Sequence, residues 1–175
     1  NKYKLRSPNI LMKSKPANKI QDLQFFGEFG GVNPSISDSS TYTFLSANSM
    51  SETFEGNMEG CYLYSRNSSP SNLYLEEACA AMEGTEAANV FSSGMGAITS
   101  CILQLCKSGD HIISSRTVYG GTYAFLKNFT PQLGIETDFV DITSIDDIKK
   151  LIKPCTKIIY CEVSSNPLLE IADIE

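Results

Sequence analysis

A glycine-rich turn is the segment best suited to binding a ligand. Its sequence is Ser92-Ser93-Gly94-Met95-Gly96, and it lies between an apolar run and a predicted helix. The first turn of a helix has backbone N–H groups without partners, which together with the helix dipole favour an anion. Gly94 has no Cβ and would let the backbone approach that anion. Strand-to-helix turns also use glycine for steric reasons alone, so phosphate binding and a plain turn both stay open.

Two familiar nucleotide-binding motifs are excluded at this turn. A P-loop needs a lysine followed by serine or threonine after its second glycine, whereas Gly96 is followed by Ala97 and Ile98. A Rossmann fingerprint needs glycine or alanine where Thr99 stands, and an acidic residue at a strand end about twenty positions later. Asp110 precedes a predicted strand instead, so a dinucleotide-binding fold is disfavoured.

Two larger side chains could also contact a ligand. Tyr119 precedes a glycine pair and could stack on a planar ring, or it could be a half-buried core tyrosine. Arg66, two residues after Tyr64, could bind a phosphate through two hydrogen bonds, or it could be a solvated surface residue. Glu162 and Asn166 could hydrogen-bond a polar ligand, although Asn-Pro is equally typical of a turn.

Alternating strands and helices would position these residues. Hydrophobic periodicity predicts helices over residues 70–83, 95–107, 122–129 and 145–152, and strands over 87–92, 111–114, 135–141 and 157–162. This order predicts βαβ units and a mostly parallel sheet, in which ligands bind at the carboxyl ends of the strands. The turns after residues 92, 114 and 162 should therefore meet at one edge.

Capping residues and apolar spacing refine three of the helices. Ser69 and Pro70 are typical of a helix start, and Gly84 is typical of its end. Ser144 and Asp147 form a predicted capping box. The predicted inner faces carry Leu75, Ala78, Cys79 and Met82 in the helix over 70–83, and Ile98, Ile102 and Leu105 in the helix over 95–107.

Composition narrows the class of protein. The chain has 175 residues, 42% of them hydrophobic, and a formal net charge of −6. The acidic charge and the absence of a basic run argue against a nucleic-acid partner, and no apolar stretch is long enough for a membrane span. The single histidine gives little for a metal site, so no metal is expected. Six cysteines without a C-x-x-C pair predict free thiols in a reducing compartment, which we expect to be the cytoplasm.

Two regions of the chain differ in amino-acid composition and in hydrophobic pattern. Residues 1–60 are rich in serine, asparagine and glycine and predict an extended N-terminal arm that needs another surface to order it. Residues 61–175 carry the α/β pattern and predict the first part of a larger domain. The last residues look like the start of a further element, so a fragment is expected.

Six segments in order resemble the cystathionine γ-synthase, cystathionine γ-lyase and methionine γ-lyase family of enzymes that depend on pyridoxal 5′-phosphate (PLP). The segments are Tyr64-Ser65-Arg66-Asn67-Ser68-Ser69-Pro70, Leu75-Glu76, Met82-Glu83-Gly84, Ser93-Gly94-Met95-Gly96-Ala97-Ile98, Val118-Tyr119-Gly120-Gly121-Thr122 and Glu162-Val163-Ser164-Ser165-Asn166-Pro167. The resemblance implies fold type I, a three-layer αβα domain with a mostly parallel sheet behind the N-terminal arm. It implies sulfur amino-acid or O-acylhomoserine substrates and a homodimer, usually paired into a homotetramer.

The resemblance also implies roles at matched positions. The backbone at Gly94 and Met95 would hold the PLP phosphate. Tyr119 would stack on the ring and assist catalysis, and Asn166 would lie near the 3′-oxygen of PLP. Tyr64 and Arg66 would reach the PLP of the neighbouring subunit. Glu162 is expected to be a supporting hydrogen-bonding residue rather than a catalyst.

The reaction itself has open alternatives. The resemblance implies β/γ-elimination by a carbon–sulfur lyase, or γ-replacement as in cystathionine γ-synthase or O-acylhomoserine sulfhydrylase. Gly121 stands where methionine γ-lyases typically have cysteine, which weakens that assignment. The family's Schiff-base lysine and the aspartate facing the ring nitrogen would lie beyond Glu175. A non-catalytic phosphate-binding or interaction module is therefore a further alternative.

Overall fold

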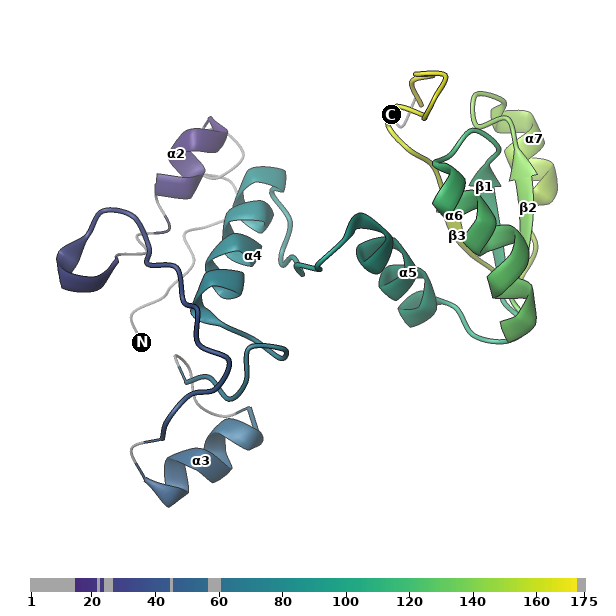
Figure 1. Ribbon diagram of the computed structural model, residues 1–175. Helices are drawn as coiled ribbons and strands as arrows, with labels where there is room; N and C mark the ends of the chain where they lie inside the picture. Colours follow the sequence, from purple (N-terminus) through teal and green to yellow (C-terminus); the bar gives the residue numbers. More distant parts are fainter. Residues whose placement is uncertain (1–14, 22, 24–26, 45, 57–60, 173–175) are drawn as a thin grey trace. The chain divides into compact units, whose positions relative to one another are not determined.

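A computed structural model describes residues 15–21, 23, 27–44, 46–56 and 61–172 of the chain. The chain divides into two compact units, Asn1–Val90 and Phe91–Glu175, and each has its own internal packing. They are called here the N-terminal unit and the α/β unit (Figure 1). The predicted division at residues 60 and 61 stays a prediction.

The N-terminal unit is built from short helices joined by long irregular segments. The described helices are α2 (Pro16–Gln21), η1 (Glu28–Gly30), α3 (Ala47–Phe54) and α4 (Pro70–Glu83). The Ser46 hydroxyl accepts a hydrogen bond from the Ser49 amide, and the Ser49 hydroxyl accepts one from the Ser46 amide. This reciprocal cap starts α3 inside a region whose composition predicts only an extended arm.

Helix α4 begins and ends where its capping residues predict. The Ser69 hydroxyl accepts a hydrogen bond from the Asn72 amide at 3.2 Å, and Pro70 is the first helical residue. Gly84 ends the helix with φ +71°, a left-handed conformation that suits glycine. The predicted boundaries are confirmed.

The predicted buried face of α4 is confirmed at Ala78 and is wrong at Leu75 and Met82. Ala78 and Ala80 are buried, whereas Leu75 and Met82 are 46% and 38% exposed. Helical spacing places residues on a common face, but a face is buried only where another element covers it. No described residue of the N-terminal unit covers Leu75 in that way, and the prediction of an inner Leu75 and Met82 is wrong here.

The α/β unit contains a parallel sheet of three strands in the described part of the chain. The strands are β1 (His111–Ser115), β2 (Glu136–Val140) and β3 (Thr156–Tyr160), in the order β2-β1-β3. Central β1 is buried along its whole length, as expected for a short apolar strand with neighbours on both edges. The predicted strands at 111–114, 135–141 and 157–162 and the parallel pairing are confirmed.

Helices connect and cover these strands. They are α5 (Gly94–Leu105), α6 (Gly120–Ala124), the short π-helix η2 (Phe125–Phe129), the 3-10 helix η3 (Thr130–Leu133) and α7 (Ile145–Leu151). The step from β1 to β2 and the step from β2 to β3 run in opposite directions across the sheet, so right-handed crossovers place α6 and α7 on opposite faces. In Figure 1, α6 lies in front of β1 and α7 behind β2.

One hydrophobic cluster holds this unit together. It consists of buried Ile102, Cys106, Ile112, Leu126 and Ile135, with Ile98, Phe125, Phe139 and Ile158 packed against it. Ile98 and Ile102 thus form the predicted inner face of α5. The third predicted inner residue, Leu105, is 57% exposed because it lies at the last helical position, beyond the edge of the core.

A polar network crosses all three strands. The ring of buried His111 contacts the Thr156 hydroxyl at Nδ1 (2.8 Å) and the Asp138 carboxylate at Nε2 (3.1 Å). Lys153 also reaches Asp138, at 2.9 Å, and its amide donates to the Thr156 hydroxyl. The hydrogen bond from Lys153 lowers the pKa of Asp138, and the nearby His111 ring acts in the same direction. Each polar atom of the His111 ring therefore has a partner, as burial requires.

Two local predictions are wrong. Residues 87–92 form no strand, since the described part of the chain offers them no neighbouring strand to pair with. The capping box at α7 does not form: the Ser144 hydroxyl donates to the Asp147 carboxylate at 2.8 Å instead of accepting a backbone N–H.

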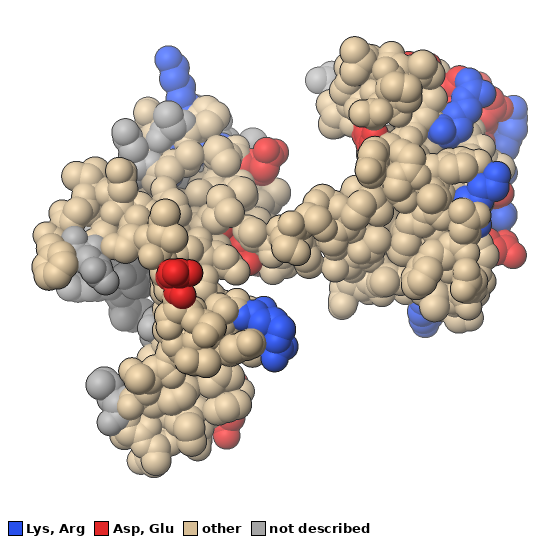
Figure 2. All heavy atoms as spheres, in the orientation of Figure 1, with Lys and Arg blue, Asp and Glu red and all other residues tan. Residues whose placement is uncertain are grey.

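Charged side chains of both signs lie together on the α/β unit. Figure 2 shows blue and red atoms interspersed on one side of this unit. Arg116 pairs with Asp141 at 2.8 Å and Lys150 with Asp147 at 2.8 Å. Among the described residues, no helix is long and apolar enough to cross a membrane.

Candidate active site

The N-terminus of α5 has two free backbone donors. Ser93 caps the helix, and its hydroxyl accepts a hydrogen bond from the Gly96 amide at 3.0 Å. Within the part of the chain that the structure describes, the amides of Gly94 and Met95 have no acceptor. Helix α5 has 12 residues, so its dipole reinforces the attraction of these amides for an anion.

Glycine is found at positions 94 and 96 of this turn for different structural reasons. A Cβ at Gly96 would lie 3.1 Å from the Ser93 hydroxyl, so the helix cap itself requires a small residue there. A Cβ at Gly94 would meet nothing within 4 Å, and its φ is not in the left-handed region. Neither packing nor backbone strain explains Gly94. Open space beside two free amides fits the close approach of a ligand phosphate.

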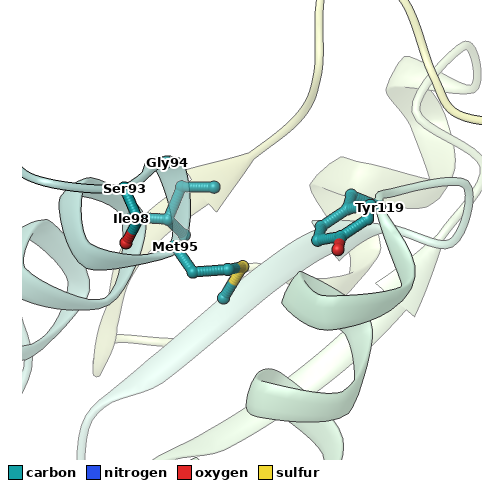
Figure 3. A pocket seen from close by; sticks show the side chains of 5 residues that line it. All are labelled: Ser93, Gly94, Met95, Ile98 and Tyr119. Carbon is teal, nitrogen blue, oxygen red and sulfur yellow. The ribbon is translucent and has the colours of Figure 1, made fainter.

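A shallow hollow lies directly beside this helix end. It has a volume of about 410 Å³ and is lined by Ser93, Gly94, Met95, Ile98 and Tyr119. Figure 3 shows the Met95 side chain pointing toward the Tyr119 ring, with the residues of α5 on one side of the space and Tyr119 on the other. The first and second predicted junctions therefore meet at this hollow, although residues 87–92, before the first junction, form no strand.

Glycine at position 121 makes room for the Tyr119 ring. A Cβ there would lie 2.6 Å from Cε1 of Tyr119 and 3.2 Å from Sδ of Met95. The Thr122 hydroxyl, fully buried, lies 3.8 Å from the same sulfur atom. Thr122 was not singled out from the sequence, since only its burial beneath Met95 shows that it supports the wall of the hollow.

The third predicted junction contacts the second through Glu162. One carboxylate oxygen of Glu162 accepts a hydrogen bond from the Tyr119 amide at 2.9 Å. Glu162 lies two residues after β3 and Tyr119 four residues after β1, and these two strands are paired neighbours. The expectation that Glu162 is a hydrogen-bonding residue is matched by this contact, and its partner is a backbone group.

Asn166 lies farther along the same loop. Its side chain is exposed, and it is not among the residues that line the hollow. The peptide bond to Pro167 is cis, and the loop is closed by an antiparallel bridge between Ser164 and Ile171. The structure thus places Asn166 in the loop after β3 and outside the lining of the hollow.

Tyr64 and Arg66 belong to the N-terminal unit. Both side chains are exposed, and the Arg66 guanidinium lies 5.2 Å from the centre of the Tyr64 ring, a cation–π distance. Tyr64 forms an antiparallel bridge with Thr41, and the Ser65 amide donates to the Ser40 carbonyl at 2.9 Å. These contacts fix the segment and leave the guanidinium donors facing solvent.

Two tyrosines near the hollow have different surroundings. Burial raises the pKa of the Tyr160 phenol, and a hydrogen bond with Thr122 opposes that effect in part. Tyr119 is 50% exposed and borders the hollow. A ligand in the hollow would therefore meet the Tyr119 ring, and Tyr160 is not among the residues that line the hollow.

These features fit a phosphate-bearing planar cofactor. The free amides of Gly94 and Met95 suit a phosphate, and the exposed Tyr119 ring suits stacking on an aromatic ring. Among the described residues, no group of three or more histidine, cysteine or acidic side chains is placed to hold a metal ion. The donor set in the hollow is therefore made of backbone amides and an aromatic ring.

Comparison with known proteins identifies the family. Residues 18–175 match the model of the family described as Cys/Met metabolism PLP-dependent enzyme. A methionine gamma-lyase of Arabidopsis thaliana is 43% identical over 175 residues, which cover 97% of this chain and 40% of that protein. A cystathionine gamma-lyase of Bacillus subtilis is 45% identical over 113 residues, covering 65% of this chain and 30% of that protein. The chain thus spans about 40% of the length of the Arabidopsis relative.

Solved structures agree with the predicted fold. The structure of metB from Corynebacterium glutamicum matches with a TM-score of 0.81 and 29% identity, over 96% of this chain and 41% of that one. A putative O-acetylhomoserine (thiol)-lyase (metY) from Campylobacter jejuni, which contains a pyridoxyl-lysine group, matches with a TM-score of 0.83 and 28% identity, over 92% of this chain and 40% of that one. The predicted α/β fold of fold type I is confirmed. The chain belongs to the Cys/Met metabolism family of PLP-dependent enzymes.

Proposed function

We propose that the full-length protein is a PLP-dependent carbon–sulfur lyase that performs β/γ-elimination on a sulfur-containing amino acid. The observation that carries the proposal is the hollow at the start of α5, where two free amides, an open glycine and the Tyr119 ring lie together. Its relatives named as methionine and cystathionine gamma-lyases support the choice of reaction.

Gly94 and Met95 would bind the PLP phosphate through their backbone amides. The amides point outward from the first turn of α5, where the helix dipole adds to their attraction for a dianion. Ser93 keeps this turn in shape because its hydroxyl caps the helix. Asn166, in the loop that follows β3, would hydrogen-bond the 3′-oxygen of the cofactor.

Tyr119 would stack on the cofactor ring and move a proton at its phenol oxygen. Bound PLP would stabilise the negative charge that develops at the substrate Cα. No protein side chain stabilises that charge as well. A half-exposed phenol at the edge of the hollow can reach a substrate bound there. The leaving sulfur atom needs a proton, and Tyr119 is the residue we assign to deliver it.

Tyr64 and Arg66 would bind the PLP phosphate of a neighbouring subunit. The Tyr64 ring holds the guanidinium while its donors face solvent, as a phosphate site in another chain would require. This assignment makes the enzyme a homodimer whose two sites each use residues from both chains, and a homotetramer would be a pair of such dimers.

A γ-replacement reaction is the second candidate. It is favoured by the likeness to the putative O-acetylhomoserine (thiol)-lyase structure. Glycine at position 121 fits either reaction, because a side chain there would force the Tyr119 ring to move. A phosphate-binding module without catalysis is the remaining alternative, and it predicts phosphate binding without turnover.

Spectroscopy and assays of the full-length protein test the proposal. We expect an absorbance band of lysine-bound PLP that borohydride abolishes, and release of a thiol from cystathionine or methionine. Activity only with an O-acylhomoserine and a thiol would favour γ-replacement. A protein purified with PLP present that shows no such band would contradict both enzyme proposals.

Substitution of Arg66 tests the assigned phosphate contact. Arg66→Ala should raise the dissociation constant of PLP by about tenfold or more, since hydrogen bonds to a charged group are worth roughly 1.5–3 kcal/mol. Arg116→Ala is the matched control, because Arg116 is also exposed but pairs with Asp141 in the α/β unit. Equal PLP affinity in both variants would refute the role of Arg66.

A further inference from the structure

The position of Tyr119 depends on few contacts. Tyr119 is the residue before α6, a helix of only five residues, and no side chain caps that helix. In the described part of the chain, the Tyr119 phenol has no hydrogen-bond partner. The ring rests beside Gly121 and Met95, which limit where it can go but do not pull it into place.

The Tyr119 amide has one specific partner, the Glu162 carboxylate. The distance from the amide nitrogen to the carboxylate oxygen is 2.9 Å, and a hydrogen bond to a carboxylate is stronger than one between neutral groups. It joins the segment after β1 to the segment after β3 across the edge where the hollow lies. No lysine or arginine among the described residues pairs with Glu162, so this carboxylate is not part of a surface ion pair.

We propose that Glu162 is a positioning residue that holds Tyr119 over the hollow through the Tyr119 backbone amide. The proposal rests on the proposed function as far as it concerns catalysis, because the position of the Tyr119 phenol affects a reaction rate only if Tyr119 acts in the reaction. Without the Glu162 bond, the turn between β1 and α6 could shift and carry the ring away from the space beside Met95. A displacement of about 1 Å can cost up to about a hundredfold in rate.

Amide hydrogen exchange tests the bond itself, with or without PLP. In the full-length protein, the Tyr119 amide should exchange at least about tenfold faster in Glu162→Ala than in the wild type. Glu162→Gln keeps an acceptor oxygen without the charge and should lie between the two. Glu170→Ala, an exposed glutamate on the same loop, should leave the exchange of Tyr119 unchanged. Equal exchange in Glu162→Ala and wild type would overturn the proposal.

Kinetics test whether the effect passes through Tyr119. Glu162→Ala should lower kcat by about tenfold or more with little change in KM, and Glu162→Gln should recover part of the loss. In a Tyr119→Phe background the same Glu162→Ala change should have little further effect, because both act on one phenol. Additive losses in the double variant would overturn the positioning role. A full-length protein that never binds PLP would contradict the proposed function instead, and the exchange measurement would still decide the Glu162 bond.

Discussion

The two units of the chain are stabilised by different means. In the α/β unit, Ile102, Ile112 and Leu126 are buried in one cluster that both α5 and the strand β1 share. In the N-terminal unit, Ala78 and Ala80 are buried, while Val32 and Ile36 are 87% and 91% exposed. The α/β unit is held by a hydrophobic core. The described residues of the N-terminal unit are held by helix caps and by hydrogen bonds such as that from the Ser37 amide to the Ser71 hydroxyl. The candidate cofactor site lies on the unit that has its own core, which can keep the hollow in shape.

The largest effect should come from opening that core. Ile112→Ala should lower the free energy of unfolding by about 2–5 kcal/mol, because Ile112 is fully buried and its removal leaves a cavity. Ile36→Ala makes the same chemical change at an exposed site and should stay within about 0.5 kcal/mol. Urea unfolding of the full-length protein, repeated at several protein concentrations, measures both changes in the free energy of unfolding.

The concentration series sharpens the comparison. A residue of the N-terminal unit that is exposed in its own chain can gain contacts only from another surface, so any loss in Ile36→Ala should appear as weaker self-association. If Ile36→Ala instead lowered the unfolding free energy as much as Ile112→Ala at every concentration, the N-terminal unit would have a core of its own.

The helix caps should give a smaller and equal effect in the two units. Ser69→Ala and Ser93→Ala each remove a hydroxyl that accepts a hydrogen bond from the amide three residues on, and each should cost about 1 kcal/mol. Glycine at either position should cost only a few tenths of this. PLP affinity should fall mainly in Ser93→Ala, because α5 provides the proposed phosphate site. A larger loss of affinity in Ser69→Ala would contradict the placement of that site.

The smallest effect should come from a charge interaction within the α/β unit, and it should be lost at acid pH. The hydrogen bond from Lys153 lowers the pKa of Asp138, so the ionised carboxylate stabilises the folded state at pH values above the ordinary aspartate pKa of about 3.9. Asp138→Asn should lose this contribution at neutral pH. The difference from wild type should disappear as the pH falls below about 4. Lys153→Met should remove most of this difference in stability between Asp138→Asn and wild type. A difference that does not change with pH would argue against the hydrogen bond from Lys153 as its cause.

The sequence was most informative where local chemistry decides the structure. Ser69, Pro70 and Gly84 predicted both ends of α4, because capping bonds and a left-handed glycine depend only on near neighbours. The same local logic failed at Ser144, whose hydroxyl found a carboxylate in place of a backbone amide. Burial was predicted less well: Ile102 is in the core, but Leu75 is exposed, because periodicity does not say what covers a face.

The sequence by itself determined the family, the parallel α/β order and the glycine turn at the start of α5, since these follow from residue types and spacing along the chain. Only the tertiary structure decided that Gly94 borders open space while Gly96 fits a helix cap, and that Gly121 makes room for the ring of Tyr119. It also joined Glu162 to the Tyr119 amide, 43 residues apart in the chain. Contacts of that kind form only when paired strands bring their ends together, and no local pattern encodes which atoms then meet.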